Sequence, residues 1–268
     1  MNNIEIISNK KGDYNDLSET YWNQEDLEKT KPFYVKEDIS KLENNNHLSA
    51  LYAQLIYLLE NTKTSLKNKK ILSLGSGSCW LESWLISRSN EKPHLFDAVD
   101  FSKHRIHDLG PITLNYYNID VPIKLYCGDM INTIPHTDSY DIIILCQSLH
   151  HSESPILLLK EANQLLAENG IIIIMGEHFF SLRERLFQLT KHFIKYFIDH
   201  RSYRLSHYLL PSYDDLFPPS IEKGDIHYSL SQYHFMFKKS QLDIFLHDSN
   251  KKCGIQGFVL KNKKKKTY

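Results

Sequence analysis

The chain has 268 residues, 41% of them hydrophobic, which suits one large α/β domain with additions or two small domains. Lysine plus arginine equals aspartate plus glutamate, at 32 each, so no overall field draws the protein to nucleic acid, and we expect no such partner. The first residues lack the basic and apolar regions of a signal peptide, and no apolar run reaches the ~18 residues of a membrane span, so we expect a cytoplasmic protein.

Residues 1–69 are predicted to form a helical N-terminal cap or lid. The clearest element is a helix in which leucines recur at the spacing of one helix face: Leu48, Leu51, Leu55, Leu58 and Leu59. Upstream, large aromatic residues stand in a polar segment, in the stretches 20–22 and 32–35. These residues either cover a site or pack against the helix.

From residue 70 the pattern changes to short apolar runs, at 71–74, 95–99, 123–127, 141–146 and 171–175. The last two are continuous and rich in isoleucine, which is typical of parallel strands covered on both faces. A helix is predicted between them over residues 155–168, and it ends at Asn169-Gly170. The alternation of strand and helix predicts a doubly wound α/β sheet, with residues 70–178 as its core.

Residues 179–240 are predicted to be a helical insertion after the fifth strand. An aromatic-rich amphipathic helix covers 180–198, and Ser229 caps a second helix that extends to Lys239. The first helix packs on the sheet or a second subunit, covers a site as a lid, or touches a membrane through residues 179–198, and we favour packing. In residues 241–268, the runs 242–246 and 254–260 are expected to be closing strands, followed by a solvated basic tail.

Three strand ends carry residues suited to a bound nucleoside, because ligands of open α/β sheets lie at the carboxyl ends of the strands. The first strand ends in Gly75-Ser76-Gly77, where glycine allows a sharp turn and close approach of a ligand to the backbone. Asp100 ends the second strand, where a carboxylate accepts from ribose hydroxyls. Asp129 and Met130 follow the third strand, where they suit the amino group and the face of an adenine.

The same loop argues against a dinucleotide. A pyrophosphate favours the pattern G-x-G-x-x-G, whose third glycine permits close packing of helix against strand. Trp80 occupies that third position here. An NAD-dependent oxidoreductase is therefore the least favoured interpretation.

The ordered motifs resemble those of class I S-adenosylmethionine-dependent methyltransferases. The resemblance rests on Ile71–Cys79, Ala98–Ser102, Cys127–Asp129 and Tyr140–His151, and on the approach to the fifth strand, Leu165–Gly170 with Glu177. It covers residues 70–178 and extends to the last two runs, which fit the antiparallel closing pair of that family. It implies a Rossmann-like, mostly parallel, seven-stranded sheet and S-adenosylmethionine as cofactor.

The resemblance also implies a set of cofactor-binding residues: Ser73, Gly75, Ser76, Gly77, Asp100, Phe101, Asp129, Met130, Gln147 and Ser148. The glycines would lie along the methionine part and Asp100 would hold the ribose. Phe101, Asp129 and Met130 would surround the adenine, and Gln147 and Ser148 would line the cleft near the sulfonium.

Two positions depart from the family pattern. Ser73 stands where an acidic residue is expected at the end of the first strand, and Cys79 stands where the loop is expected to have its third glycine. Loss of the carboxylate leaves the amino group of the cofactor without its expected acceptor. These departures motivate an alternative hypothesis, a non-catalytic module that binds the cofactor without turnover.

Histidines are the candidate catalytic residues, because methyl transfer to a hydroxyl needs a base and histidine titrates near neutral pH. His151 follows the fourth strand beside His150, His178 ends the fifth strand, and His227 lies beyond the insertion. A metal held by Glu177, His178 and His227 is the weaker alternative, since no i, i+4 ligand pair supports it, and we expect no metal.

We therefore predict a methyltransferase that acts on an oxygen or nitrogen of a small molecule, with a sugar or secondary metabolite favoured as acceptor. Residues 179–240 are expected to bind that acceptor. The Asn-Pro-Pro-Tyr type of signature, found where amino groups of nucleic acid or protein are methylated, is absent after the fourth strand. The oligomeric state is left open.

Overall fold

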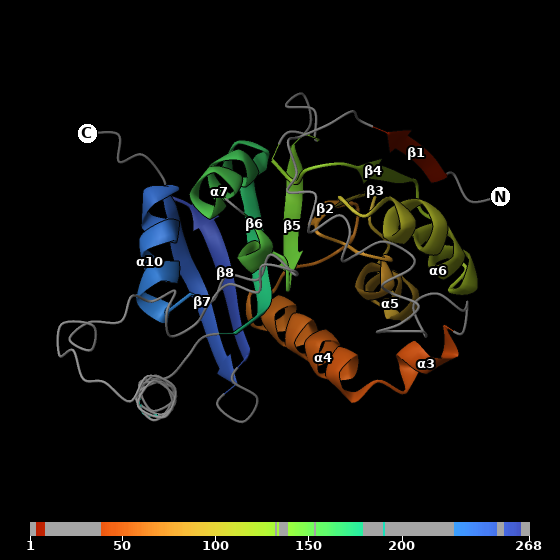
Figure 1. Ribbon diagram of the computed structural model, residues 1–268, viewed down its shortest axis with the longest axis horizontal. Helices are drawn as coiled ribbons and strands as arrows, with labels where there is room; N and C mark the ends of the chain where they lie inside the picture. The colour runs from red at the N-terminus through yellow and green to blue at the C-terminus, as the bar shows by residue number, and fades with distance from the viewer. Residues whose placement is uncertain are drawn as a thin grey trace, which may run out of the picture.

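The computed structural model describes residues 4–8, 39–131, 133, 139–152, 154–178, 190, 228–250 and 255–263. Within them, eight strands form one sheet in the order β1-β4-β3-β2-β5-β6-β8-β7 (Figure 1). The strands are β1 (Ile4–Ser8), β2 (Lys70–Leu74), β3 (Leu95–Asp100), β4 (Ile123–Cys127), β5 (Tyr140–Cys146), β6 (Leu166–His178), β7 (Leu242–Asn250) and β8 (Ile255–Asn262). Neighbours from β1 to β6 are parallel, whereas β8 runs antiparallel to both β6 and β7.

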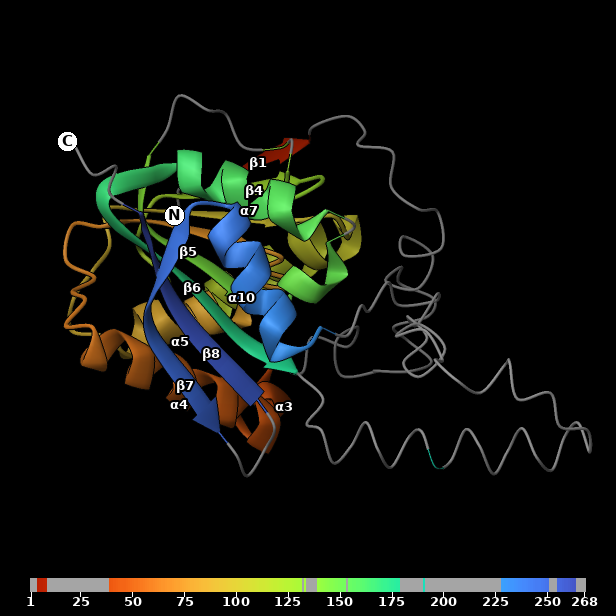
Figure 2. The ribbon, with the colours of Figure 1, turned by 90° about the vertical axis from the view of Figure 1, so that its left-hand side faces the viewer.

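Helices cover both faces of the sheet, with α7 and α10 side by side on one face and α4 on the other (Figure 2). Their bounds are α3 (Ser40–Glu43), α4 (Asn46–Asn61), α5 (Trp80–Arg88), η2 (His104–Leu109), α6 (Gly110–Tyr116), η3 (Leu149–His151), α7 (Pro155–Gln164) and α10 (Leu230–Lys239).

Two apolar cores lie between these helices and the sheet. We call the one that contains Leu55, Trp84 and Ile144 the α5-side core, and the one that contains Ile143 and Phe237 the α7-side core. Successive strand residues point to opposite faces, so the continuous isoleucine runs of β5 and β6 supply both cores. The predicted doubly wound, mostly parallel sheet is confirmed, and each of the seven expected strands is present.

Local sequence signals explain where two helices begin. The Asn45 side chain accepts hydrogen bonds from the backbone N–H groups of His47 and Leu48, at 3.0 and 3.3 Å, and so caps α4. Ser229 caps α10 as predicted: its hydroxyl accepts from Gln232 N at 3.3 Å, and the Gln232 side chain accepts from Ser229 N at 2.7 Å.

Two elements differ from the sequence predictions. Residues 4–8 lie in the region expected to be helical, but they form β1, an edge strand parallel to β4 that adds an eighth strand. The helix expected over 155–168 ends at Gln164, and Leu166 already belongs to β6. Leu166 pairs with Tyr140 of β5, and this pairing with the sheet overrides the helical propensity of the segment.

The stretches 20–22 and 32–35 and the end of the lysine-rich tail lie outside the described residues, as does the aromatic-rich helix predicted for 180–198 apart from residue 190. Within the part of the chain that the structure describes, no helix combines the length and apolar character that crossing a membrane requires.

Candidate active site

The turns after β2 and β5 meet at the carboxyl edge of the sheet. The Ser148 hydroxyl donates to the Leu74 carbonyl at 2.7 Å. Gly75 has a φ of 75°, and a Cβ there would lie 2.4 Å from Ser148 Cβ and 3.4 Å from Met130 Sδ. Glycine is therefore required both by the left-handed backbone and by the packing of the two turns. Three predicted site residues, Gly75, Met130 and Ser148, are in this way brought together.

Asp100 ties the glycine loop to the end of β3. Its carboxylate accepts from Gly77 N at 2.7 Å and from Ser102 N at 2.9 Å, and the residue is 3% exposed. The guanidinium of Arg105 lies against Gly77, where an added Cβ would come within 2.2 Å of Nη2. Each carboxylate oxygen has a second lone pair, so Asp100 can hold the loop and still accept from a ligand hydroxyl.

The remaining predicted cofactor residues are placed around this edge. Asp129 uses one oxygen to accept from Ile131 N at 2.9 Å, and its side chain is partly exposed. Phe101 directly follows β3 and is also partly exposed. Gln147 has a φ of 51°, and its side-chain oxygen lies 3.3 Å from Nε2 of His47, so the start of α4 reaches this edge.

Ser73 is paired with a carboxyl group that the sequence analysis missed. Its hydroxyl donates to Oε1 of Glu82 at 2.5 Å, and Glu82, in the first turn of α5, is 1% exposed. Burial raises the pKa of Glu82 to about 7, opposed by the hydrogen bond from Ser73. The sequence offered one signal for this pair: Glu82 is an acidic residue nine positions after Ser73, in the helix that follows the glycine loop.

Glu177, near the end of β6, is the centre of a buried hydrogen-bond network. Its Oε2 lies 2.9 Å from His150 Nδ1 and accepts from the Tyr233 hydroxyl at 2.8 Å, and its Oε1 accepts from Leu149 N at 3.1 Å. Burial raises the pKa of Glu177, but the His150 charge and the hydrogen bonds from His150 and Tyr233 outweigh it and hold the pKa below its ordinary value.

A β-bulge aims Glu177 at this network. Ile174 belongs to the α7-side core, so strict alternation would turn Glu177, three residues later, toward the opposite face. The register of β6 on β8 shifts between Met175 and Glu177, and the extra residue, Gly176, has a φ of 72°. The Gln54 side chain accepts from Gly176 N at 3.2 Å, so α4 holds the bulge in place.

The histidines singled out in the sequence fall in different places. The His151 ring lies beside the His150 ring, with ring centres 4.2 Å apart and the ring planes tilted by 45°. His178 is the last residue of β6, opposite Ile255 of β8, and only its backbone is described. His227 lies outside the described residues. Among residues that are described, no cluster of three or more metal-binding side chains occurs, and the proposed set of Glu177, His178 and His227 falls only partly within them.

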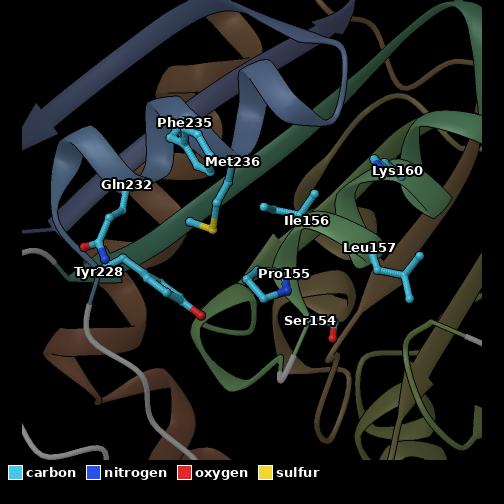
Figure 3. Close-up of a pocket in the computed structure, with 9 residues that line it drawn as sticks. All are labelled: Ser154, Pro155, Ile156, Leu157, Lys160, Tyr228, Gln232, Phe235 and Met236. Atoms are coloured by element: carbon cyan, nitrogen blue, oxygen red, sulfur yellow. The ribbon is translucent and has the colours of Figure 1, made fainter. Parts of the chain in front are cut away.

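A groove of about 520 Å³ lies between α7 and α10 (Figure 3). Most of its lining is apolar: Ser154, Pro155, Ile156, Leu157, Lys160, Tyr228, Gln232, Phe235 and Met236. Ile156 and Met236 point toward one another, and Tyr228 extends toward Pro155. The Tyr228 ring packs on Tyr233 at 5.6 Å, and Tyr233 donates to Glu177, so the groove adjoins the Glu177 network.

Comparisons with known proteins identify the fold and one matching domain. Residues 72–174 match the family model described as "Methyltransferase domain". No curated protein matches the sequence.

Solved structures resemble the chain in fold at low identity. Magnesium protoporphyrin IX methyltransferase from Synechocystis PCC 6803, solved with bound S-adenosylhomocysteine, has a TM-score of 0.60 and 12% identity over 92% of this chain and 99% of that one. A Haloferax volcanii putative methyltransferase, solved with the activator Trm112, has a TM-score of 0.57 and 12% identity over 85% and 95% of the two chains.

Mitomycin 7-O-methyltransferase has a TM-score of 0.55 and 12% identity over 90% of this chain, which spans 60% of that protein's length. The sheet order, the glycine loop and the matched domain agree with one another and with the cofactor predicted from sequence. Residues 72–174 therefore form a methyltransferase domain, and the chain has the fold of S-adenosylmethionine-dependent methyltransferases.

Proposed function

We propose that the protein methylates a hydroxyl oxygen of a small molecule, with His150 as the general base and Glu177 as the residue that orients it. The hydrogen bond between His150 and Glu177 is the observation that carries this proposal. A methyl acceptor that is protonated at neutral pH, such as an alcohol or phenol, needs a base, whereas a neutral amine does not. The paired histidine therefore favours oxygen over nitrogen.

The residues at the carboxyl edge fit S-adenosylmethionine. Asp100 would accept from the ribose hydroxyls, Gly75 and Gly77 would lie along the methionine part, and Asp129 with Met130 would bind the adenine. When bound, the cofactor supplies a methyl group on a positively charged sulfur, which is transferred in one displacement step. The protein's task is to orient the acceptor and to remove its proton.

The hydrogen bond to Glu177 determines which ring nitrogen of His150 can act as the base. When Nδ1 donates its proton to Glu177, the lone pair of the neutral ring lies on Nε2, which can take the proton of an acceptor hydroxyl. The buried Glu177 carboxylate then stabilises the imidazolium that forms. His150 keeps 15% of its side chain exposed, whereas Glu177 is fully buried, so His150 is the member of the pair that an acceptor can reach.

The groove between α7 and α10 is the proposed acceptor site. Its volume and its apolar lining are those of small-molecule pockets. Tyr228, Gln232, Phe235 and Met236 come from the region 179–240 that the sequence analysis assigned to the acceptor. An apolar secondary metabolite suits this lining better than a sugar does, and the name of mitomycin 7-O-methyltransferase, which shares the fold, gives oxygen as the atom that is methylated.

The test is an acceptor screen that measures S-adenosylhomocysteine release. We expect release with an apolar hydroxyl compound, strong loss of release in His150→Gln, and unchanged binding of S-adenosylhomocysteine by that variant. Full turnover in His150→Gln would overturn the role of His150. Cofactor binding without turnover of any acceptor would favour the alternative, a non-catalytic cofactor-binding module.

A further inference from the structure

We propose that Glu82 supplies the carboxylate that the end of β2 lacks, and that it binds the primary ammonium group of the cofactor's methionine part. The inference rests on the proposed function, because it assumes that the cofactor's methionine part lies along the Gly75–Gly77 loop. It assigns a ligand to a residue of α5 that the sequence motifs do not mark.

The position of Glu82 follows from its contact with Ser73. Ser73 is the penultimate residue of β2, two positions before Gly75, and its hydroxyl lies 2.5 Å from Oε1 of Glu82. The Glu82 carboxyl group is therefore at the carboxyl edge of β2, where an acidic side chain at position 73 would project. The first turn of α5 thus places the Glu82 carboxyl group beside Ser73 at the end of β2.

The second oxygen of this carboxyl group is the observation that points to a ligand. Oε2 of Glu82 is buried and has no hydrogen-bond partner within the described part of the chain. A buried carboxylate oxygen without a donor is unfavourable, and such orphaned atoms are rare in folded proteins. An ammonium group offers three N–H donors and a positive charge, so it satisfies the oxygen and offsets the buried charge together.

The other charged and titratable groups around Glu82 are less suited to bind the ammonium group. Asp100 and Arg105 act on it with opposite signs, and both already engage the loop at Gly77. Cys79 and Cys146 are the neighbouring thiols, and burial raises the pKa of both, so they are neutral near pH 7. Glu82 is thus the group of this cluster whose charge changes near neutrality.

This placement couples cofactor binding to a proton. Burial raises the pKa of Glu82 to about 7. The ammonium group binds the ionised carboxylate, so binding below that pKa releases a proton, and affinity rises with pH. For a pKa near 7, the ionised fraction rises on the order of tenfold between pH 6 and pH 8.

The test compares two ligands by calorimetry on the full chain. S-adenosylhomocysteine carries the ammonium group, whereas 5′-methylthioadenosine has the same nucleoside and thioether without the amino-acid part. In Glu82→Gln, we expect the affinity for S-adenosylhomocysteine to fall by about 10- to 100-fold and to lose its pH dependence, with 5′-methylthioadenosine affinity unchanged. Equal losses for both ligands, or no loss for either, would overturn the proposal.

Two further variants separate ligand binding from a structural effect. The double variant Ser73→Asp with Glu82→Gln returns a carboxylate to the strand end, and we expect it to recover S-adenosylhomocysteine affinity. Glu60→Gln, on the exposed side of α4, is the matched control and should change neither affinity. If wild-type protein binds neither ligand, the cofactor site itself is contradicted, and this outcome is distinct from a loss confined to Glu82→Gln.

Discussion

His150 and Glu177 lie 27 positions apart, yet Nδ1 of the histidine is 2.9 Å from Oε2 of the glutamate. Adjacent parallel strands bring them together: His150 is in the turn after β5, and Glu177 is near the end of β6. The bulge at Gly176 turns the carboxylate to the correct face, and Tyr233 and Leu149 N hold it there. The strand order places the pair, and the bulge orients it.

Replacing His150 with glutamine should slow methyl transfer by about 10²- to 10⁴-fold, the usual contribution of a general base. The pH–rate profile should lose the limb that reports deprotonation of the base. Product release by stopped-time assay measures the rate, and His151→Gln is the matched control, with a much smaller expected effect. A larger loss in His151→Gln than in His150→Gln would assign the base to His151.

Replacing Gln54 with leucine should disturb the base from the opposite face of the sheet. Gly176 N is buried and would lose its acceptor, which costs about 1–3 kcal/mol of unfolding free energy. A relaxed bulge would also turn Glu177 away from His150, so kcat should fall while the dissociation constant of S-adenosylhomocysteine holds. Urea unfolding and steady-state kinetics check the two effects. Equal kcat in wild type and Gln54→Leu would show that the bulge does not depend on Gln54.

The unliganded protein should become less stable as pH rises from about 4.5 to about 7 because of Glu82, and its stability should level off above that range. The pKa of this group is about 7 in the folded state and 4.5 in its reference state, so between these values the folded state binds more protons than the unfolded chain. Raising the pH then lowers the unfolding free energy, by up to about 3 kcal/mol in total. Thermal unfolding at pH 5, 6, 7 and 8 measures the slope, which Glu82→Gln should flatten. An identical slope in this variant would refute the burial of an ionisable Glu82.

Substitutions at the groove should weaken binding of the acceptor and leave binding of the cofactor unchanged. Leu157 and Phe235 line it and are 46% and 52% exposed, so changing them disturbs little of the core. We expect Phe235→Ser to raise the KM of an apolar acceptor several-fold, without changing S-adenosylhomocysteine affinity. Phe245→Ser, at a similarly exposed position on β7, provides the control. An unchanged KM in Phe235→Ser would place the acceptor elsewhere.

The sequence predicted the sheet well because its signals are local. Continuous isoleucine runs indicate buried strands, and Ser229 with Gln232 marks a helix start. The strand β1 was missed because it has only five residues, and its half-buried residues, Ile4 and Ile7, lie on opposite faces and give no alternating pattern. The end of α7 was placed too late because pairing of Leu166 with β5 overrides local propensity.

The site was predicted less completely, since its key contacts join distant residues. The glycine loop and Asp100 follow directly from strand ends. The contact between Glu82 and Ser73 was not predicted, because it requires the Ser73 side chain to face α5, and only the packing of the helix on the sheet shows this. The pairing of His150 with Glu177 could not be predicted, because Glu177 is on another strand. The bulge depends on the positive backbone φ of Gly176. Glycine permits a positive φ, but its presence in a sequence does not show that the residue adopts one.

We propose above all that this protein binds S-adenosylmethionine, with Asp100 at the ribose and the Gly75–Gly77 loop along the methionine part. Equilibrium dialysis with S-adenosylhomocysteine tests it most directly, with wild type and Asp100→Ala compared after thermal unfolding has shown that both are folded. We expect one molar equivalent to bind wild type, and a loss of about 1–3 kcal/mol in Asp100→Ala, which raises the dissociation constant about 5- to 150-fold. Absence of saturable binding by wild type, or equal dissociation constants for the two proteins, would contradict the claim.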